Sequence, residues 1–320
     1  MNLLTVSAEE VERCLPYDEC IPLMREAMIA LSQGRTRQLL RHILDLSEGR
    51  AFGSMLGAML DDGTFGAKLV SVYPENFAKG GHSHQGVVLL FDGATGAPSA
   101  ALEAGTITAI RTAAASAAAT DALARTGARR LAILGYGEQA WRHVEAIRVV
   151  RDIEQVTVWG RSAERAEAFA SRVQENGLAA TAMSDARQAV AEADIVCTVT
   201  ASPEPILLGE WVADGTHVNA VGSSRAGPAE IDNDLVVRSR FFADHREGVL
   251  AQGAEFLRAR AAGRVDDSHV LGEIGEVMAG TLEGRRSERD VTIYKSLGNI
   301  AQDLAAARHI VARLGREDRR

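Results

Sequence analysis

The sequence has few cysteines and few aromatic residues, no excess of positive charge and no long hydrophobic run. Its three cysteines (Cys14, Cys20 and Cys197) are an odd number and lack the close pairing typical of a metal site or a disulfide framework. We therefore expect three reduced, buried thiols and no metal ion. The net charge of −8 argues against a nucleic-acid partner held through its phosphates.

No apolar segment approaches the length that spans a bilayer, so the sequence predicts no membrane partner. Acidic residues (Glu9, Glu10 and Glu12) stand where a secretory signal would need basic and then apolar residues. These two features predict a cytoplasmic protein. The apolar fraction of 46% is ordinary for a soluble globular protein, and 320 residues suffice for two domains.

The N-terminal region combines two helical patterns with short apolar segments. Ser7 and Glu10 form a capping-box pattern before a helix over 8–14, and a second helix over 18–33 ends at Gly34. Short apolar segments bounded by turn residues follow at 38–46, 52–60, 64–73 and 85–92. The pattern predicts an α+β region with mostly antiparallel strands.

A long helix rich in Ala, Ser and Thr is expected over 106–127, and a different pattern follows it. Strand-like segments alternate with helical ones from there on. The expected strands are 131–135, 155–159, 194–199, 216–221 and 240–243, and the expected helices are 138–150, 163–176 and 184–192. Such alternation predicts βαβ units on a parallel sheet. The tail over 297–314 is amphipathic, and we expect it to pack against the N-terminal region.

The stretch "LAILGYGEQA" (131–140) carries a dinucleotide-binding pattern between its expected strand and helix. Gly135 permits a tight turn, Gly137 permits close approach of a pyrophosphate, and Ala140 allows the helix to pack closely on the strand. The N-terminus of the helix then offers free N–H groups to the phosphates. The alternative is a plain strand-to-helix turn. Three coinciding features favour a Rossmann βαβ unit instead.

The end of the second strand bears on cofactor choice. A site for NAD(H) usually has an acidic residue there, whereas this chain has Trp159, Gly160, Arg161 and Ser162. An arginine and a hydroxyl suit a 2′-phosphate, so NADP(H) is favoured and NAD(H) is the alternative. Ser162 is also a candidate N-cap and Arg161 a candidate solvated charge, and both interpretations can hold together.

Several longer stretches accompany the glycine turn. They include "GAKLVSVYPEN" (66–76), "SHQGVVLLFDGATG" (83–96), "ITAIRTAAASA" (107–117), "EPILLGEWV" (204–212), "HVNAVGSSR" (217–225) and "KSLG" (295–298). From about residue 5 to residue 315 the chain resembles the ornithine cyclodeaminase/mu-crystallin family. The resemblance implies an α/β protein and a homodimer. It implies a substrate-binding and dimerisation domain of residues 1–120 plus 296–320, and a Rossmann domain of residues 121–295.

Within that family a cationic triad holds the substrate carboxylate, and the matching residues are Arg41, Lys68 and Arg111. A guanidinium can grip a carboxylate through two hydrogen bonds. A lysine crowded by two arginines has its ammonium form disfavoured, so it can give up a proton near neutral pH. Lys68 is therefore the first candidate proton donor and His84 the second. His82 and His42 are further candidates for making the pocket cationic.

Two departures from the cyclodeaminase pattern predict the reaction. Ser224 stands where that branch has an aspartate, and the neighbourhood of Met55 lacks its glutamate. The loop over 223–225 and the "SHQ" of 83–85 resemble the mu-crystallin branch instead, which reduces cyclic ketimines. We expect an imine reductase that converts an α-imino or ketimine carboxylate, such as 1-pyrroline-2-carboxylate or iminosuccinate, to the L-amino acid, or the reverse. The alternatives are a cyclodeaminase-type lyase and a non-catalytic NADP(H)-dependent binder.

The remaining expected contacts complete the site. Ser224 and Arg225 are expected on the substrate side. The further cofactor contacts are expected from Thr112, Glu138, Gln139, Thr200, Val221, Ser223, Leu297 and Gly298.

Overall fold

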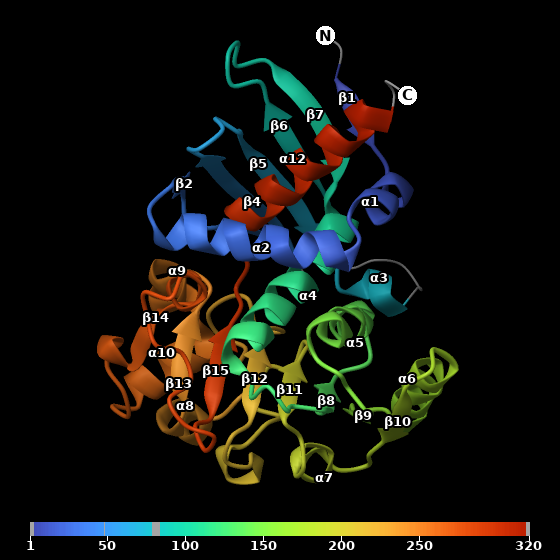
Figure 1. Ribbon diagram of the computed structural model, residues 1–320, viewed down its shortest axis with the longest axis vertical. Coiled ribbons are helices and arrows are strands. Elements are labelled where there is room, and N and C mark those ends of the chain that lie inside the picture. The colour runs from blue at the N-terminus through green and yellow to red at the C-terminus, as the bar shows by residue number, and fades with distance from the viewer. Residues whose placement is uncertain (1–2, 48, 79–83, 318–320) are drawn as a thin grey trace. The chain divides into compact units, whose positions relative to one another are not determined.

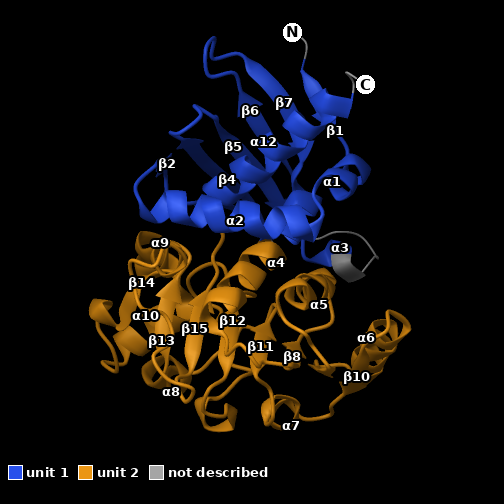
Figure 2. Cartoon of the chain, viewed as in Figure 1, with its two compact units in different colours: residues 1–111, 299–320 blue, residues 112–298 orange. Residues whose placement is uncertain are grey.

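The computed structural model describes residues 3–47, 49–78 and 84–317. The chain divides into two compact units (Figure 2): unit 1 is Met1–Arg111 with Asn299–Arg320, and unit 2 is Thr112–Gly298. The first division follows Arg111, and the boundary expected from the sequence followed residue 120; both lie inside helix α4 (Ala104–Leu123). A continuous helical pattern contains no signal for the point at which a helix passes from one unit to the next.

Unit 1 is built on one sheet with the strand order β1-β7-β6-β5-β4-β2, and β3 pairs with β4 outside that order. All its neighbouring strands are antiparallel except β1 and β7, as the α+β pattern predicts. The segment expected over 38–46 forms two strands, which pair with different halves of β4. The strands are Leu4–Val6 (β1), Thr36–Gln38 (β2), His42–Ser47 (β3), Arg50–Met59 (β4), Phe65–Val72 (β5), His84–Phe91 (β6) and Pro98–Glu103 (β7).

The helices of unit 1 are Ala8–Cys14 (α1), Tyr17–Ser32 (α2), Glu75–Ala78 (α3), the first part of α4 and Ile300–Glu317 (α12). The expected capping box of Ser7 and Glu10 is present at α1. Helix α12 packs along α2 and across β4, β5 and β6, so it covers one face of the sheet (Figure 1). Met55 and Lys68 are paired on β4 and β5 and lie buried on this face. The C-terminal helix therefore packs on the N-terminal region, as its amphipathic pattern predicts.

Unit 2 is built on an eight-stranded sheet whose strands are all parallel. Its order is β10-β9-β8-β11-β12-β15-β13-β14. If the first six of these strands are numbered among themselves by their order in the chain, they follow the order 3-2-1-4-5-6 of dinucleotide-binding sheets. This order confirms the expected α/β class. The strands are Arg130–Leu134 (β8), Gln155–Trp159 (β9), Ala179–Ala182 (β10), Ile195–Thr198 (β11), His217–Ala220 (β12), Arg240–Ala243 (β13), Val270–Glu273 (β14) and Thr292–Lys295 (β15).

The helices of unit 2 are the rest of α4, Glu138–Val150 (α5), Ala163–Glu175 (α6), Ala186–Val190 (α7), Asn233–Arg238 (α8), Arg246–Gln252 (α9), Ala254–Ala261 (α10) and Ile274–Met278 (α11). The sequence did not predict β10, β14 or β15. Each has four residues, as do β11, β12 and β13, which the sequence did predict, so length alone does not explain the difference. All three cysteines are buried and free, as expected.

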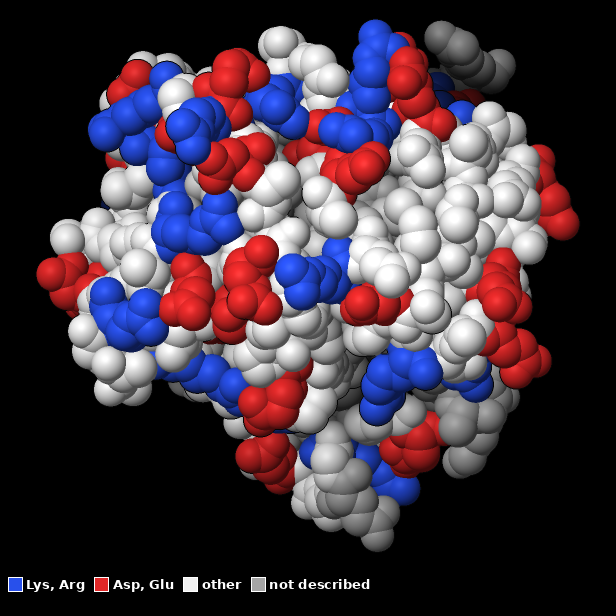
Figure 3. Space-filling model, turned by 90° about the horizontal axis from the view of Figure 1, so that it is seen from below, with Lys and Arg blue, Asp and Glu red and all other residues white. Residues whose placement is uncertain are grey.

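The surface of unit 2 mixes charges of both signs. Figure 3 shows basic and acidic side chains next to one another over the face seen from below in Figure 1. The ion pairs of unit 2 include Arg264–Asp234 at 2.8 Å and Arg258–Glu204 at 3.0 Å. Within the described residues, no helix is long and apolar enough to cross a membrane, and no group of three or more His, Cys, Asp and Glu could hold a metal ion.

Candidate functional site

The glycine turn after β8 has the geometry that a pyrophosphate needs. Gly135 has φ +133°, and a Cβ added there would lie 2.9 Å from the Val199 carbonyl oxygen. Gly137 is the N-cap of α5, and a Cβ added there would meet no atom within 4 Å. The first position therefore requires glycine. The second leaves open space beside a helix N-terminus, which fits a bound phosphate.

This turn lies at the topological switch point of the unit 2 sheet. From β8 the chain builds β9 and β10 on one side, and then β11, β12 and β15 on the other. Ligands of such sheets bind beyond the carboxyl ends of the strands at this point. The close approach of Gly135 to Val199 places the loops after β8 and β11 side by side.

The predicted cofactor contacts gather at the same edge of the sheet. All of them except Thr112, a buried residue of α4, follow the carboxyl end of a strand. They are Gly135, Gly137, Glu138, Gln139 and Ala140 after β8, Gly160, Arg161 and Ser162 after β9, Thr200 after β11, Val221 and Ser223 after β12, and Leu297 and Gly298 after β15.

In the segment after β9, a side chain at residue 160 would require the Tyr136 ring to move. A Cβ added at Gly160 would lie 2.2 Å from Cε1 of Tyr136, because the Tyr136 ring occupies that position. Arg161 is exposed. Ser162 is the N-cap of α6, and its hydroxyl accepts a hydrogen bond from the Arg165 amide at 3.3 Å. The capping interpretation of Ser162 is thus confirmed.

A buried cationic cluster lies in unit 1, where α4, β5 and α12 meet. Lys68 is 3% exposed, and its Nζ donates to Thr108 Oγ1 at 2.6 Å and to Asp303 Oδ1 at 3.0 Å. Arg111 is also 3% exposed, and its Nε donates to the same Asp303 oxygen at 3.1 Å. Its Nη1 donates to Gln302 Oε1 at 2.7 Å, so two neighbouring residues of α12 fix the guanidinium plane.

The pKa of Lys68 is lowered to about 8 in these surroundings. Burial is the main cause, and the charges of Arg111 and Arg41 act in the same direction, whereas Asp303 raises the pKa. This corrects the sequence argument, which attributed the shift to crowding by arginines alone. Burial also raises the pKa of Asp303, but the charges of Arg111 and Lys68 outweigh it and leave that pKa below its usual range.

Asp303 and Gln302 are site residues that the sequence reasoning missed. Asp303 is fully buried and stands between Ile300 and Leu304 on the apolar stripe of α12. A carboxylate on the buried stripe of an amphipathic helix was the available signal, because such a group is rarely buried without a partner.

The other predicted substrate-side residues lie in different surroundings. Arg41 is half-buried just before β3, and His42 begins that strand with an exposed side chain. The main chain of His84 begins β6 opposite Val72, but its side chain, like His82 and Ser83, lies outside the described residues. In the loop after β12, Ser224 is half-buried and Arg225 is exposed.

Residues 2–317 match the model of the ornithine cyclodeaminase/mu-crystallin family. The chain belongs to this family. The chain is similar to the ketimine reductase mu-crystallin of Mus musculus, with 36% identity over 308 residues that cover 95% of each chain.

Two solved structures show how far the fold is shared within the family. The Delta(1)-pyrroline-2-carboxylate reductase of Thermococcus litoralis, in complex with NADH and L-proline, is 32% identical with a TM-score of 0.93 over 96% of each chain. An archaeal alanine dehydrogenase dimer with bound NAD is 30% identical with a TM-score of 0.93, over 99% of this chain and 98% of that one.

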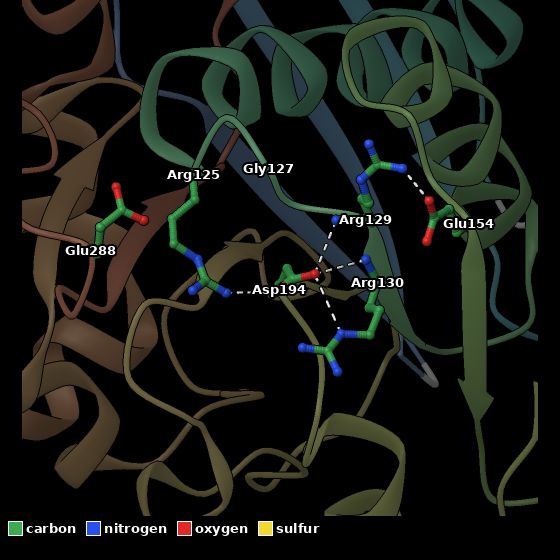
Figure 4. A pocket seen from close by; sticks show the side chains of 7 residues that line it. All are labelled: Arg125, Gly127, Arg129, Arg130, Glu154, Asp194 and Glu288. Atoms are coloured by element: carbon green, nitrogen blue, oxygen red, sulfur yellow. Dashed lines mark hydrogen bonds and ion pairs between the residues drawn. The ribbon is translucent and has the colours of Figure 1, made fainter.

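A separate cavity of about 470 Å³ lies at the opposite, amino ends of the unit 2 strands (Figure 4). It is lined by Arg125, Gly127, Arg129, Arg130, Glu154, Asp194 and Glu288. Asp194 accepts from Arg125 at 2.5 Å, and Arg129 pairs with Glu154. Among the described residues, none predicted for the substrate or cofactor site lines this cavity.

Proposed function

We propose that this chain is an imine reductase that uses a nicotinamide dinucleotide to convert an α-imino or ketimine carboxylate into the L-amino acid. Run in reverse, the same chemistry is that of an amino-acid dehydrogenase. The buried cluster of Lys68, Arg111 and Asp303 carries the proposal, since it supplies anion-binding groups and a titratable lysine in a chain with a dinucleotide turn. Relatives named ketimine reductase, pyrroline-2-carboxylate reductase and alanine dehydrogenase support both directions.

Arg111, with Arg41, binds the substrate carboxylate in this proposal. Gln302 and Asp303 hold the Arg111 guanidinium, so little conformational freedom is lost when it takes a second, planar anion. Orientation of the imine by this grip would account for most of the rate gain.

Lys68 supplies the proton. With a pKa of about 8, it is largely protonated at neutral pH yet can release a proton to the substrate nitrogen. When bound, a reduced nicotinamide would supply the hydride for the imine carbon. The C=N bond becomes CH–NH, and Lys68 regains its proton from solvent in a later step. His84 stays the second candidate donor.

The proposed cofactor is NADP(H) in preference to NAD(H). Three features favour a 2′-phosphate: Tyr136 fills the space of a side chain at residue 160, Arg161 is exposed beside it, and the N-terminus of α6 follows. No acidic residue stands at 159–162 to bind a ribose diol or to repel a phosphate.

A second copy of the chain is the proposed partner. The face of the unit 1 sheet opposite α12 exposes large apolar side chains on β3 and β4. They include Leu44 at 62% exposure, Leu56 at 47% and Phe52 at 41%. Contiguous apolar surface of this kind marks an association site, and the archaeal alanine dehydrogenase is a dimer.

A spectrophotometric assay tests the function. The purified chain is mixed with NADPH or NADH and a panel of 1-pyrroline-2-carboxylate, iminosuccinate, and 2-keto acids with ammonia or methylamine. Nucleotide oxidation with at least one imine is expected, and Lys68→Ala should abolish it while nucleotide binding persists. Tight nucleotide binding without turnover would favour a binder. Ammonia released from ornithine with trace NAD would favour a lyase.

A further inference from the structure

Glu230 joins two loops at the carboxyl edge of the unit 2 sheet. It is fully buried, and its Oε1 accepts from the amide of Thr200 at 2.6 Å and from the Thr200 hydroxyl at 2.6 Å. Its Oε2 accepts from the amide of Gly222 at 2.7 Å. Thr200 lies in the loop after β11 and Gly222 in the loop after β12. One carboxylate therefore holds both loops through three hydrogen bonds.

The contact depends on glycine at residue 222. A Cβ added there would lie 2.6 Å from Glu230 Oε1 and 2.1 Å from the Thr200 carbonyl oxygen. Backbone and carboxylate approach each other too closely for any larger residue.

A buried ion pair extends this arrangement to a third strand. Lys295 ends β15, and its Nζ lies 2.8 Å from Glu255 Oε2 and donates to the Ser223 carbonyl at 2.6 Å. Glu255 Oε1 accepts from the Glu230 amide at 3.2 Å. The charged groups of Glu230, Glu255 and Lys295 are all shielded from water, so their hydrogen bonds are not exchanged for bonds to solvent.

The loops that Glu230 joins belong to the second half of the dinucleotide-binding sheet. Such a sheet has two mononucleotide-binding halves. The turn at Gly135 and the segment after β9 serve the adenosine half. The loops after β11 and β12 lie across the switch point, and Val199 of the first contacts Gly135. They therefore stand where the nicotinamide half belongs.

We propose that Glu230 is a positioning residue for the nicotinamide half of the dinucleotide. It sets the spacing of the loops at Thr200 and Gly222 without touching the cofactor. This inference rests on the proposed function, because it presumes a nicotinamide dinucleotide at this edge. Glutamine in its place keeps the shape, but its amide NH₂ faces a backbone donor that then has no acceptor.

The test is a binding measurement on the full chain carrying Glu230→Gln. Fluorescence titration gives the Kd of NADH and NADPH, and the Kd of ADP reports on the adenosine half alone. The expected result is a Kd for both dinucleotides that rises about tenfold or more, with an ADP Kd within about twofold of wild type. Dinucleotide affinity that stays within twofold, or ADP affinity that falls equally, would overturn the proposal.

Asp194→Asn is the matched control. Asp194 is a buried carboxylate just before β11, at the opposite end of that strand from Thr200. It accepts from the amides of Arg129 at 3.0 Å and Arg130 at 2.9 Å (Figure 4). The control should lower the Tm but leave both dinucleotide affinities unchanged. Equal loss of dinucleotide binding in the control would assign the effect to general stability and contradict the role of Glu230.

Two further measurements keep the outcomes distinct. If Glu230→Gln does not fold, Glu230→Asp is measured in its place. Aspartate retains the carboxylate with a shorter reach, so the loss of dinucleotide affinity should be smaller than the loss expected for Glu230→Gln. Wild-type affinity in that variant would count against the proposal. If the wild-type chain binds neither NADH nor NADPH, the proposed function itself fails. If the wild-type chain binds them and the Glu230 variant binds them equally well, only the role of Glu230 fails.

Discussion

The amino group of Lys68 and the carboxylate of Asp303 lie 3.0 Å apart although 235 residues separate them in the chain. Both side chains are buried, at 4% and 0% exposure. The same carboxylate oxygen also meets Arg111. Asp303 thus compensates the charges of two buried cations in unit 1, and it raises the pKa of one of them, Lys68.

The pH dependence of turnover should report on Lys68. A donor must be protonated, so imine reduction should decline as pH rises through about 8, and amino-acid oxidation should increase over the same range. The measurement is kcat/KM against pH in both directions. In Lys68→Arg, whose guanidinium does not release a proton in this pH range, turnover should fall sharply and any residual rate should show no transition near pH 8. A transition that persists unchanged would assign it to another group.

Asp303→Asn should move that transition to lower pH. Asp303 is the group that raises the pKa of Lys68, so its loss leaves burial and the neighbouring arginines to lower that pKa further, by about one pH unit. Unfolding free energy should also fall by about 3 kcal/mol at neutral pH, because buried cations lose their partner. A transition at the wild-type pH would show that Asp303 does not act on Lys68.

The stability difference between wild type and Asp303→Asn should narrow in acid. The folded-state pKa of Asp303 lies below its unfolded value, so its contribution is present above the unfolded value and is lost as pH falls through the folded one. Urea unfolding at neutral and at acidic pH measures this difference.

Arg111→Ala should mainly weaken substrate binding. Loss of a charge-assisted grip on the carboxylate should raise the KM of the imine about tenfold to a hundredfold, with dinucleotide Kd little changed. Steady-state kinetics give the KM of the imine, and a nucleotide titration gives the dinucleotide Kd. The exposed Arg37, also in unit 1, is the control, and Arg37→Ala should leave KM at its wild-type value. An unaltered KM in Arg111→Ala would discredit the assigned role.

Arg161→Ala should distinguish the two cofactors. The Kd of NADPH should rise about tenfold, because a guanidinium contact with the 2′-phosphate is lost, while that of NADH should stay within twofold. Arg187→Ala removes another exposed arginine of unit 2, on α7, and should alter neither value. Equal weakening of NADPH and NADH by Arg161→Ala would exclude the 2′-phosphate contact.

Charged substitutions on the open face of the unit 1 sheet should dissociate the dimer. Phe52→Glu with Leu56→Glu places two carboxylates among exposed apolar side chains and should yield a monomer in sedimentation velocity. Leu271→Glu alters a comparably exposed leucine on β14 of unit 2 and should leave the dimer intact. A monomeric wild-type chain, or a double variant that remains dimeric, would contradict this surface assignment.

The parts of the fold that were predictable have local causes. The turn at Gly135 and Gly137 follows a strand and begins a helix within one βαβ unit, so residue spacing alone predicted its geometry. The amphipathic period of the C-terminal helix likewise predicted that this helix packs against the N-terminal region. Strand β15 was not predicted; in the structure it pairs with β12 and β13.

The sequence by itself determined the dinucleotide turn and the alternation of βαβ units, because glycine conformation and apolar periodicity act over a few neighbouring residues. The candidate cations came from the family resemblance. Tertiary structure alone decided that Asp303 meets Lys68 and that Glu230 joins the loops at Thr200 and Gly222. The partner of a buried charge depends on which distant segments pack against it, and no local spacing encodes that choice.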